Sequence, residues 1–121
     1  MTITVNHLAL ETTDVQRAQD FYRRYFGFRK VDESGPDGFL TNNAGFVLVL
    51  EAVDSPSGPP GVFHFGFFLP DAGDVRRLFG AMKSDGVRFE QELVEGTNMR
   101  GQGTVLFFCL DPDGHKIEVR A

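Results

Sequence analysis

The sequence contains no tryptophan, a single cysteine and no long apolar run, and each scarcity narrows what the chain can be. The lone Cys109 excludes an internal disulfide framework and favours a reducing compartment, so we expect a cytoplasmic protein. No stretch approaches the ~20 apolar residues of a membrane span, and no membrane partner is expected. The formal net charge is −5 with acidic and basic residues interspersed, so the chain offers no basic face for nucleic acid.

The apolar content that is present suffices for one globular domain. Hydrophobic residues make up 41% of the 121 positions, which is enough to bury a core in a chain of this length. The 13 phenylalanines supply much of the material for that core. We therefore predict a single domain over residues 1–121.

The first half of the chain is predicted to form a strand, a helix and three further strands. Residues 3–11 alternate as a strand does, and a helix is expected to begin near Val15 and to end at Gly27. Further short strands are predicted at 28–32, 38–40 and 46–53. Residues 1–53 thus form a first βαβββ module, and the stretch "DSPSGPPG" at 54–61 is predicted to be a linker.

The same order of elements follows the linker. The stretch "VFHFGFFLP" at 62–70 predicts a strand, and the next segment predicts a helix with Asp74 as a possible cap and Gly86 as its end. Residues 62–121 therefore form a second βαβββ module, which three further strands complete at 87–91, 104–110 and 116–120.

Each module opens with a histidine in its first strand. His7 and His64 are 57 positions apart, and the same offset places Asp14 on Asp71. A unit of this length that occurs twice indicates two like modules packed together rather than a solenoid, which needs at least three repeats. The sequence thus predicts an α+β fold of two βαβββ modules.

The last predicted strand carries a carboxylate among apolar residues. After a turn at 111–114, Ile117 and Val119 face one side, whereas Glu118 faces the other together with its polar neighbours. Burial of Glu118, or of His64 in its apolar strand, is costly without a partner. A divalent metal on the same sheet surface would satisfy both residues and His7. For a single histidine, a hydrogen bond to a backbone carbonyl is the ordinary alternative.

Two stretches, "VNHLALETTDVQRAQDFYRRYFGF" and "CLDPDGHKIEV", resemble the vicinal oxygen chelate superfamily. This superfamily groups glyoxalase I, extradiol dioxygenases, fosfomycin-modifying enzymes and bleomycin-binding proteins. The resemblance implies that the paired modules form a cupped mixed sheet with helices outside and a metal within. Family ligands come from the first and last strands of the modules, which implies His7, His64 and Glu118 here.

The first module departs from this pattern at its last strand. Aligning Gly45 with Gly114 places Val49 opposite Glu118, so the fourth carboxylate of glyoxalase-like members is missing. Glu51 lies two residues later on the same face, and we expect it to act in acid–base chemistry or to contact substrate. Metal ligation by Glu51 is an alternative that requires a bulge in the strand.

Other residues are candidates for substrate contact. Phe68 shares parity with His64 and suits an apolar substrate wall, and Lys116 shares the face of Glu118, where it either holds an anionic group or is merely solvated. Residues 95–104 are predicted to be a mobile lid whose Arg100 holds an anion, or else a plain solvent loop. His115 has the opposite parity from Glu118, and we expect it to be partly exposed with no metal role.

The predicted function is that of a metal-dependent enzyme acting on a small oxygen-chelating metabolite or antibiotic. A set of two histidines and one glutamate is compatible with Fe(II), Mn(II), Ni(II), Co(II) or Zn(II) and leaves positions for water and substrate. The metal would act as a Lewis acid in a lyase, dioxygenase or thiol-transferase reaction. The alternative is a non-enzymatic drug- or metabolite-binding protein of the bleomycin-resistance type. Because related short members pair, a homodimer is expected.

Overall fold

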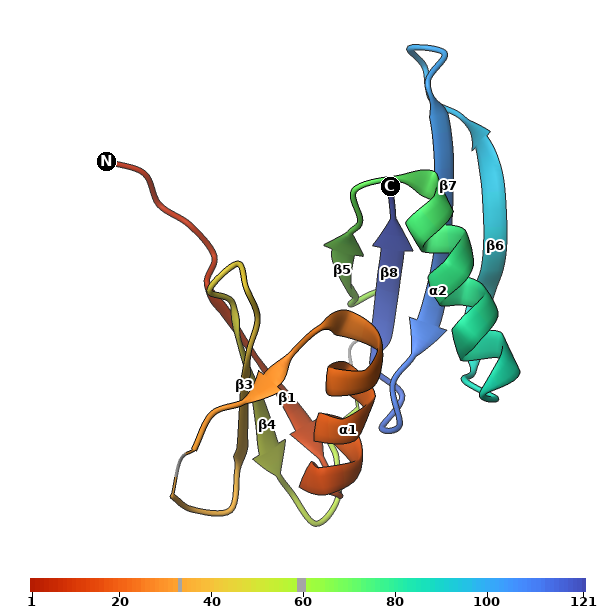
Figure 1. Cartoon of the computed structure of the whole chain (residues 1–121). Coiled ribbons are helices and arrows are strands. Elements are labelled where there is room, and N and C mark those ends of the chain that lie inside the picture. The colour runs from red at the N-terminus through yellow and green to blue at the C-terminus, as the bar shows by residue number, and fades with distance from the viewer. Residues whose placement is uncertain (33, 59–60) are drawn as a thin grey trace. The chain divides into compact units, whose positions relative to one another are not determined.

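A computed structural model describes residues 1–32, 34–58 and 61–121 (Figure 1). The chain divides into two compact units, residues 1–58 and 59–121, and each is described by itself below. The boundary falls inside the predicted linker 54–61, of which residues 59 and 60 lie outside the described residues. That the two modules make up a single domain stays a prediction.

The first unit is a four-stranded sheet with one helix. Its sheet has the order β1-β4-β3-β2, in which β1 and β4 are parallel and the other pairs are antiparallel. The elements along the chain are β1 (His7–Thr12), α1 (Val15–Phe26), β2 (Arg29–Lys30), β3 (Gly38–Thr41) and β4 (Val47–Ala52).

Local chemistry explains where α1 begins and ends. The Asp14 carboxylate accepts a hydrogen bond from the Arg17 backbone N–H at 3.0 Å and so caps the first turn. Gly27 follows the helix with φ of 70°, a left-handed conformation that glycine adopts without strain. The face of α1 that carries Ala18 and Tyr22 is fully buried. The predicted start and end of this helix are therefore confirmed.

The second unit repeats this arrangement. Its sheet has the order β5-β8-β7-β6, again with one parallel pair, β5 and β8. The elements are β5 (Phe65–Phe68), α2 (Ala72–Ser84), β6 (Phe89–Thr97), β7 (Gly103–Leu110) and β8 (Lys116–Arg120). Two mixed sheets, each with its helix, confirm the predicted α+β class and the two βαβββ modules.

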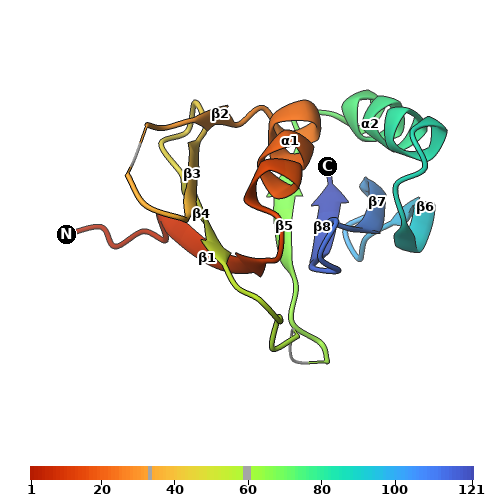
Figure 2. The same ribbon diagram turned by 90° about the horizontal axis from the view of Figure 1, so that it is seen from below.

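In the second unit α2 runs along one face of its sheet (Figures 1 and 2). Beneath it lie Ile117 and Val119 of β8, both fully buried, and Phe107 of β7, which is also fully buried. The Phe107 ring contacts those of Phe79 and Phe89, with centroids 5.5 and 5.7 Å apart. No helix in the described part of the chain is long and apolar enough to cross a membrane.

The structure corrects several predicted boundaries. Strand β1 begins at His7, so the predicted strand at 3–11 starts too early, and the alternating Ile3 and Val5 are exposed instead. The cap of α2 is Asp71, which accepts from the Asp74 backbone N–H at 3.0 Å; the prediction of Asp74 as cap is wrong. Comparison of the two modules predicts Asp71 as the cap, because Asp71 is the equivalent of Asp14, which caps α1.

The predicted lid at 95–104 is the outer part of a hairpin. Its first residues continue β6 as far as Thr97, and its last residues begin β7 at Gly103. The Asn98 carboxamide oxygen accepts from the backbone N–H groups of Arg100 and Gln102, at 2.9 and 3.0 Å, and closes the turn. Strand β6 extends well beyond its predicted end at residue 91, because its backbone pairs with that of β7 as far as Thr97.

The prediction that His115 is partly exposed is also wrong, because this residue is 9% exposed and therefore buried. The turn before β8 folds around the buried Asp111, whose Oδ1 accepts from the backbone N–H groups of Asp113 and His115, each at 2.9 Å. The Asp111 N–H also donates to the His115 carbonyl at 3.0 Å. These bonds draw His115 into the end of the sheet.

Candidate functional site

The face of each sheet opposite its helix carries the candidate site residues. In β8 the exposed fraction alternates, with Ile117 and Val119 buried on the α2 side and Lys116, Glu118 and Arg120 on the other. The predicted alternation of this strand is therefore confirmed. Since successive side chains of a strand point to opposite faces, the three polar residues share one surface.

His64 lies one residue before β5 and is exposed in the second unit, so the premise that it is a buried ring is wrong. Its Nδ1 is 3.1 Å from the carbonyl oxygen of Val62. A carbonyl oxygen only accepts, so this nitrogen carries the proton and Nε2 of the neutral ring keeps its lone pair. The ring also meets the edge of Phe108 at a centroid distance of 5.4 Å.

Glu118 lies opposite Gly66 in the parallel pairing of β5 and β8. A side chain at Gly66 would bring its Cβ to 3.1 Å from the Glu118 carbonyl oxygen and 3.5 Å from its Cβ. Glycine therefore leaves the carboxylate uncovered on the β5 side. The Glu118 side chain is 22% exposed, and its Oε2 is 3.8 Å from Nη1 of Arg120.

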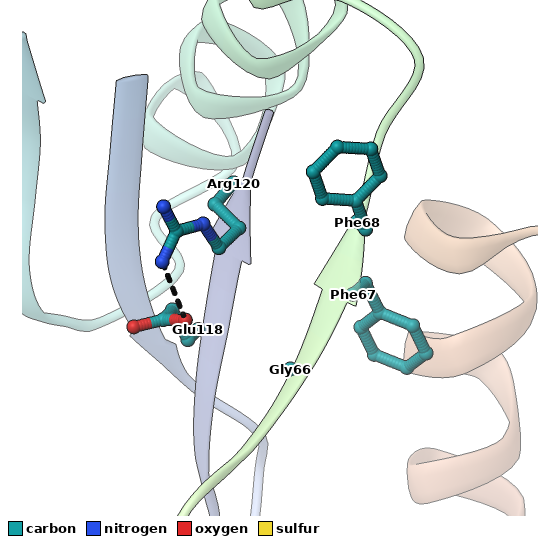
Figure 3. Close-up of a pocket in the computed structure, with 5 residues that line it drawn as sticks. All are labelled: Gly66, Phe67, Phe68, Glu118 and Arg120. Carbon is teal, nitrogen blue, oxygen red and sulfur yellow. Dashed lines mark ion pairs between the residues drawn. The ribbon is translucent and has the colours of Figure 1, made fainter. Parts of the chain in front are cut away.

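A hollow of about 210 Å³ adjoins this carboxylate (Figure 3). Its lining combines a carboxylate, a guanidinium and an aromatic ring, which come from Glu118, Arg120 and Phe68. Gly66 and Phe67 complete the lining. The structure thus places Phe68 and Glu118 in the lining of the same hollow. It also adds Arg120, which the sequence reasoning did not single out as a site residue.

The other two substrate candidates lie elsewhere in the second unit. The Lys116 ammonium pairs with the Glu90 carboxylate at 2.9 Å, and the Lys116 side chain is 19% exposed. Arg100 lies at the exposed tip of the β6–β7 hairpin and does not line the hollow. An anionic ligand of the hollow therefore meets Arg120 before either of these residues.

In the first unit, His7 opens β1 and is exposed. Its Nδ1 lies 2.8 Å from Oδ1 of Asn6, an oxygen that only accepts, so Nδ1 donates this hydrogen bond. Glu51 of β4 shares the helix-free face with His7 and lies opposite Glu11 in the parallel register. The Glu51 side chain is exposed there.

The strand registers match the two modules residue by residue. With His7 placed on His64, the pair Ala9 and Val49 in the first unit corresponds to Gly66 and Glu118 in the second. Val49 therefore stands where the second module has its carboxylate, in agreement with the predicted alignment. By the same register Glu51 corresponds to Arg120, and this repeat position is the signal in the sequence that points to Arg120.

Comparison with known proteins identifies the family. The sequence profile of the Glyoxalase/Bleomycin resistance protein/Dioxygenase superfamily matches residues 4–119. The chain belongs to this superfamily. No curated protein matches the sequence.

Solved structures of this superfamily have the same fold. A possible glyoxalase from Bacillus cereus is 26% identical with a TM-score of 0.78, and the match covers 99% of this chain and 100% of that one. A genomically encoded fosfomycin resistance protein from Listeria monocytogenes is 20% identical with a TM-score of 0.77, covering 100% and 94%. A lactoylglutathione lyase from Agrobacterium tumefaciens is 22% identical with a TM-score of 0.73, and the match covers 99% of this chain and 94% of that one.

The donor chemistry of this superfamily member fits a divalent metal. Two imidazoles, His7 and His64, each have Nδ1 in a hydrogen bond, which is the arrangement that orients Nε2 of a metal-binding histidine. Glu118 adds a carboxylate oxygen, and such mixed ligand sets suit first-row transition metals. Within the described residues no three histidine, cysteine or acidic side chains already form a cluster, and His7 belongs to a different unit from the other two.

Cys109 takes no part in the site. It is a free, fully buried thiol on the α2 side of β7. Burial raises the pKa of the Cys109 thiol to about 12, because the charged thiolate loses its hydration. At neutral pH this thiol is therefore not a nucleophile or a thiolate ligand.

Proposed function

We propose that the chain is a metal-dependent enzyme that acts on a small molecule with adjacent oxygen atoms. His7, His64 and Glu118 would hold one divalent ion, which is Fe, Mn, Ni, Co or Zn. When bound, the metal supplies Lewis acidity toward the substrate oxygens. Superfamily membership supports this proposal, since the group includes glyoxalases and dioxygenases by name.

The observation that carries the proposal is the surroundings of Glu118. Its carboxylate borders a hollow, and Gly66 leaves it uncovered on the neighbouring strand. His64 lies two residues before Gly66, and its hydrogen bond to the Val62 carbonyl uses Nδ1 rather than Nε2. The Glu118 carboxylate thus borders space for a ligand, and His64 precedes by two residues the glycine that lies opposite it.

The other residues have distinct roles in this proposal. Phe68, 76% exposed at the hollow, would pack against the apolar body of the substrate. Glu51 would remove or return a proton at a substrate carbon, since carboxylates are common general bases. Lys116 and Arg100 would interact with substrate groups that extend beyond the hollow.

We further propose a homodimer in the cytoplasm with two sites. Within their own sheets β1 and β5 are edge strands, and such edges are commonly covered by pairing between subunits. Light scattering at micromolar concentration tests this point. A monomer mass would contradict it.

Metal content tests the proposed function directly. Protein purified without chelators should contain about one transition-metal ion per chain, and Glu118→Gln should lose most of it, since an amide is a far weaker ligand than a carboxylate. The matched control is Glu95→Gln, which removes a carboxylate of the same unit that pairs with Arg76 of α2. His64→Ala should lower metal content and thermal stability together.

The same proteins distinguish an enzyme from a binding protein. A panel of 2-oxoaldehyde–thiol adducts, epoxides with thiols, and catechols with O₂ covers the reaction types of the superfamily. Turnover that depends on added metal supports the proposal. Metal-free protein that binds a drug or metabolite tightly without converting it would replace the proposal with the bleomycin-resistance alternative.

A further inference from the structure

The guanidinium of Arg120 lies beside Glu118, the proposed metal ligand. Arg120 follows Glu118 by two residues on β8, so both side chains leave the same face of the sheet. Nη1 of Arg120 is 3.8 Å from Oε2 of Glu118 (Figure 3). This distance exceeds that of a hydrogen bond, and the Arg120 side chain is 44% exposed, so the pair is weakly held and is easily exchanged.

The backbone holds Arg120 firmly at the edge of the hollow. Its carbonyl oxygen accepts from the Leu69 N–H at 2.8 Å, and its strand register places it directly opposite Phe68. The guanidinium and the Phe68 ring therefore border the same space as the Glu118 carboxylate. Such a lining suits a ligand that has an apolar or aromatic body and an anionic group.

We infer that Arg120 binds an anionic substituent of the substrate, and that its pairing with Glu118 in the metal-free protein is exchanged for this substituent once Glu118 binds the metal. The inference rests on the proposed function and names its substrate class, an oxygen chelator that carries an additional carboxylate or phosphonate. A guanidinium binds either group with two parallel hydrogen bonds.

Electrostatics provides the reason for the exchange. A carboxylate that coordinates a divalent cation has little negative charge left to attract a guanidinium, and the two cations repel each other. An anion placed next to both relieves that repulsion. Arg120 therefore opposes metal binding when no substrate is present and favours substrate binding when the metal is present.

One substitution should consequently have two opposite effects. Arg120→Gln removes the repulsion, so Co(II), titrated against a competing chelator, should bind about three- to tenfold tighter. The same change should weaken binding of the anionic ligand. A residue that only stabilises β8 would lower both affinities or neither.

A pair of ligands isolates the anionic group. Catechol has adjacent oxygens, and 3,4-dihydroxybenzoate has the same oxygens with one further carboxylate. Calorimetry on the Co(II)-loaded wild-type protein should show at least about tenfold tighter binding of 3,4-dihydroxybenzoate, and this preference should vanish in Arg120→Gln. The matched control, Arg77→Gln, removes a guanidinium that pairs with Asp74 on α2 and should change neither affinity.

The outcomes separate this inference from the function on which it rests. If the wild-type protein binds no Co(II), the proposed function fails and the inference fails with it. If Co(II) binds but the loaded protein shows no preference for the carboxylate, or if Arg120→Gln keeps that preference or binds Co(II) no more tightly, only the inference is wrong. Should Arg120→Gln not fold, Arg120→Lys decides, because it keeps the charge and loses the paired hydrogen bonds, so the preference should fall only in part.

Discussion

Where β5 meets β8, Gly66 lies opposite Glu118, and at the same position of the first unit Ala9 lies opposite Val49. Topology and register are the same in both units, so the backbone provides two equivalent positions beside a histidine. Only the second unit has a carboxylate there. The two modules therefore share a backbone arrangement but differ in the side chain at this position, and only the second can offer a carboxylate ligand there.

The next pair along the strands carries opposite charges in the two units. The first unit has Glu11 opposite Glu51, and the second has Phe68 opposite Arg120. The Glu11 carboxylate accepts hydrogen bonds from the Ser57 backbone N–H at 2.7 Å and hydroxyl at 3.3 Å. Glu51 is therefore the carboxylate of that pair better suited to proton transfer, whereas Arg120 suits anion binding.

The cores differ at a third equivalent position, Gly38 of β3 and Phe107 of β7, as the registers with Leu50 and Val119 show. A Cβ at Gly38 would lie 2.7 Å from Cγ1 of Val15, so α1 passes close over that strand. In the second unit a phenylalanine fills the corresponding space. The same topology therefore accommodates two different separations of helix and sheet.

The largest effect on stability is expected at Phe107. Phe107→Ala removes a fully buried ring and should lower the free energy of unfolding by about 3–5 kcal/mol, because a cavity remains in the second unit. Urea denaturation measures this loss. Phe68→Ala, at an exposed ring, is the matched control and should change the free energy of unfolding little. Equal losses in the two variants would refute this account of the core.

Glu51→Gln tests the division of roles between the modules. Turnover of the best substrate should fall at least ~100-fold because the general base is lost, while metal content stays nearly unchanged. Metal analysis and steady-state kinetics measure the two quantities. Glu11→Gln, on the neighbouring strand, is the control and should keep most of the activity.

Two results would contradict the assignment of Glu51. Loss of metal from Glu51→Gln would make Glu51 a fourth ligand. Retention of both metal and full activity would show that Glu51 is not the base.

Glycine substitutions sharpen the comparison of the cores. Gly38→Ala should destabilise the protein by about 1–3 kcal/mol, because its Cβ would meet Val15 and Gln19 at 2.7 Å. Gly80→Ala, within α2 and with nothing within 4 Å of the added Cβ, should instead stabilise it by roughly 0.5–1 kcal/mol. Thermal melts of the two variants should therefore shift in opposite directions, and shifts of the same sign would contradict the close approach of α1.

The smallest effects are expected at the helix caps, where the two units are alike. Asp14→Ala and Asp71→Ala should each cost about 1 kcal/mol, since each carboxylate accepts one backbone N–H in the first turn. Asparagine at either position should restore most of the loss, because its carbonyl oxygen accepts the same bond. Denaturation that left one alanine variant unaffected would show that the caps are not equivalent.

The sequence by itself determined the features that depend on neighbours along the chain. Capping by Asp14 and the left-handed Gly27 set the limits of α1, and alternation along β8 separated Glu118 from the buried Ile117 and Val119. Aligning Gly45 with Gly114 also placed Val49 opposite Glu118, in agreement with the strand registers. These signals act over a few residues, or compare a residue with its repeat, so they can be read without any tertiary contact.

Only the tertiary structure decided which strands became neighbours. Parallel pairing of β5 with β8 joins segments about fifty residues apart, and it sets Gly66 beside Glu118 and Phe68 beside Arg120. Likewise, burial of His115 depends on hydrogen bonds within a folded turn at the end of the sheet. The alternation of apolar and polar residues along one strand does not reveal which other strand will pair with it, because strand order depends on how the whole sheet packs against its helix. Local alternation therefore did not single out Arg120, whose place beside Phe68 follows from the pairing of β5 with β8.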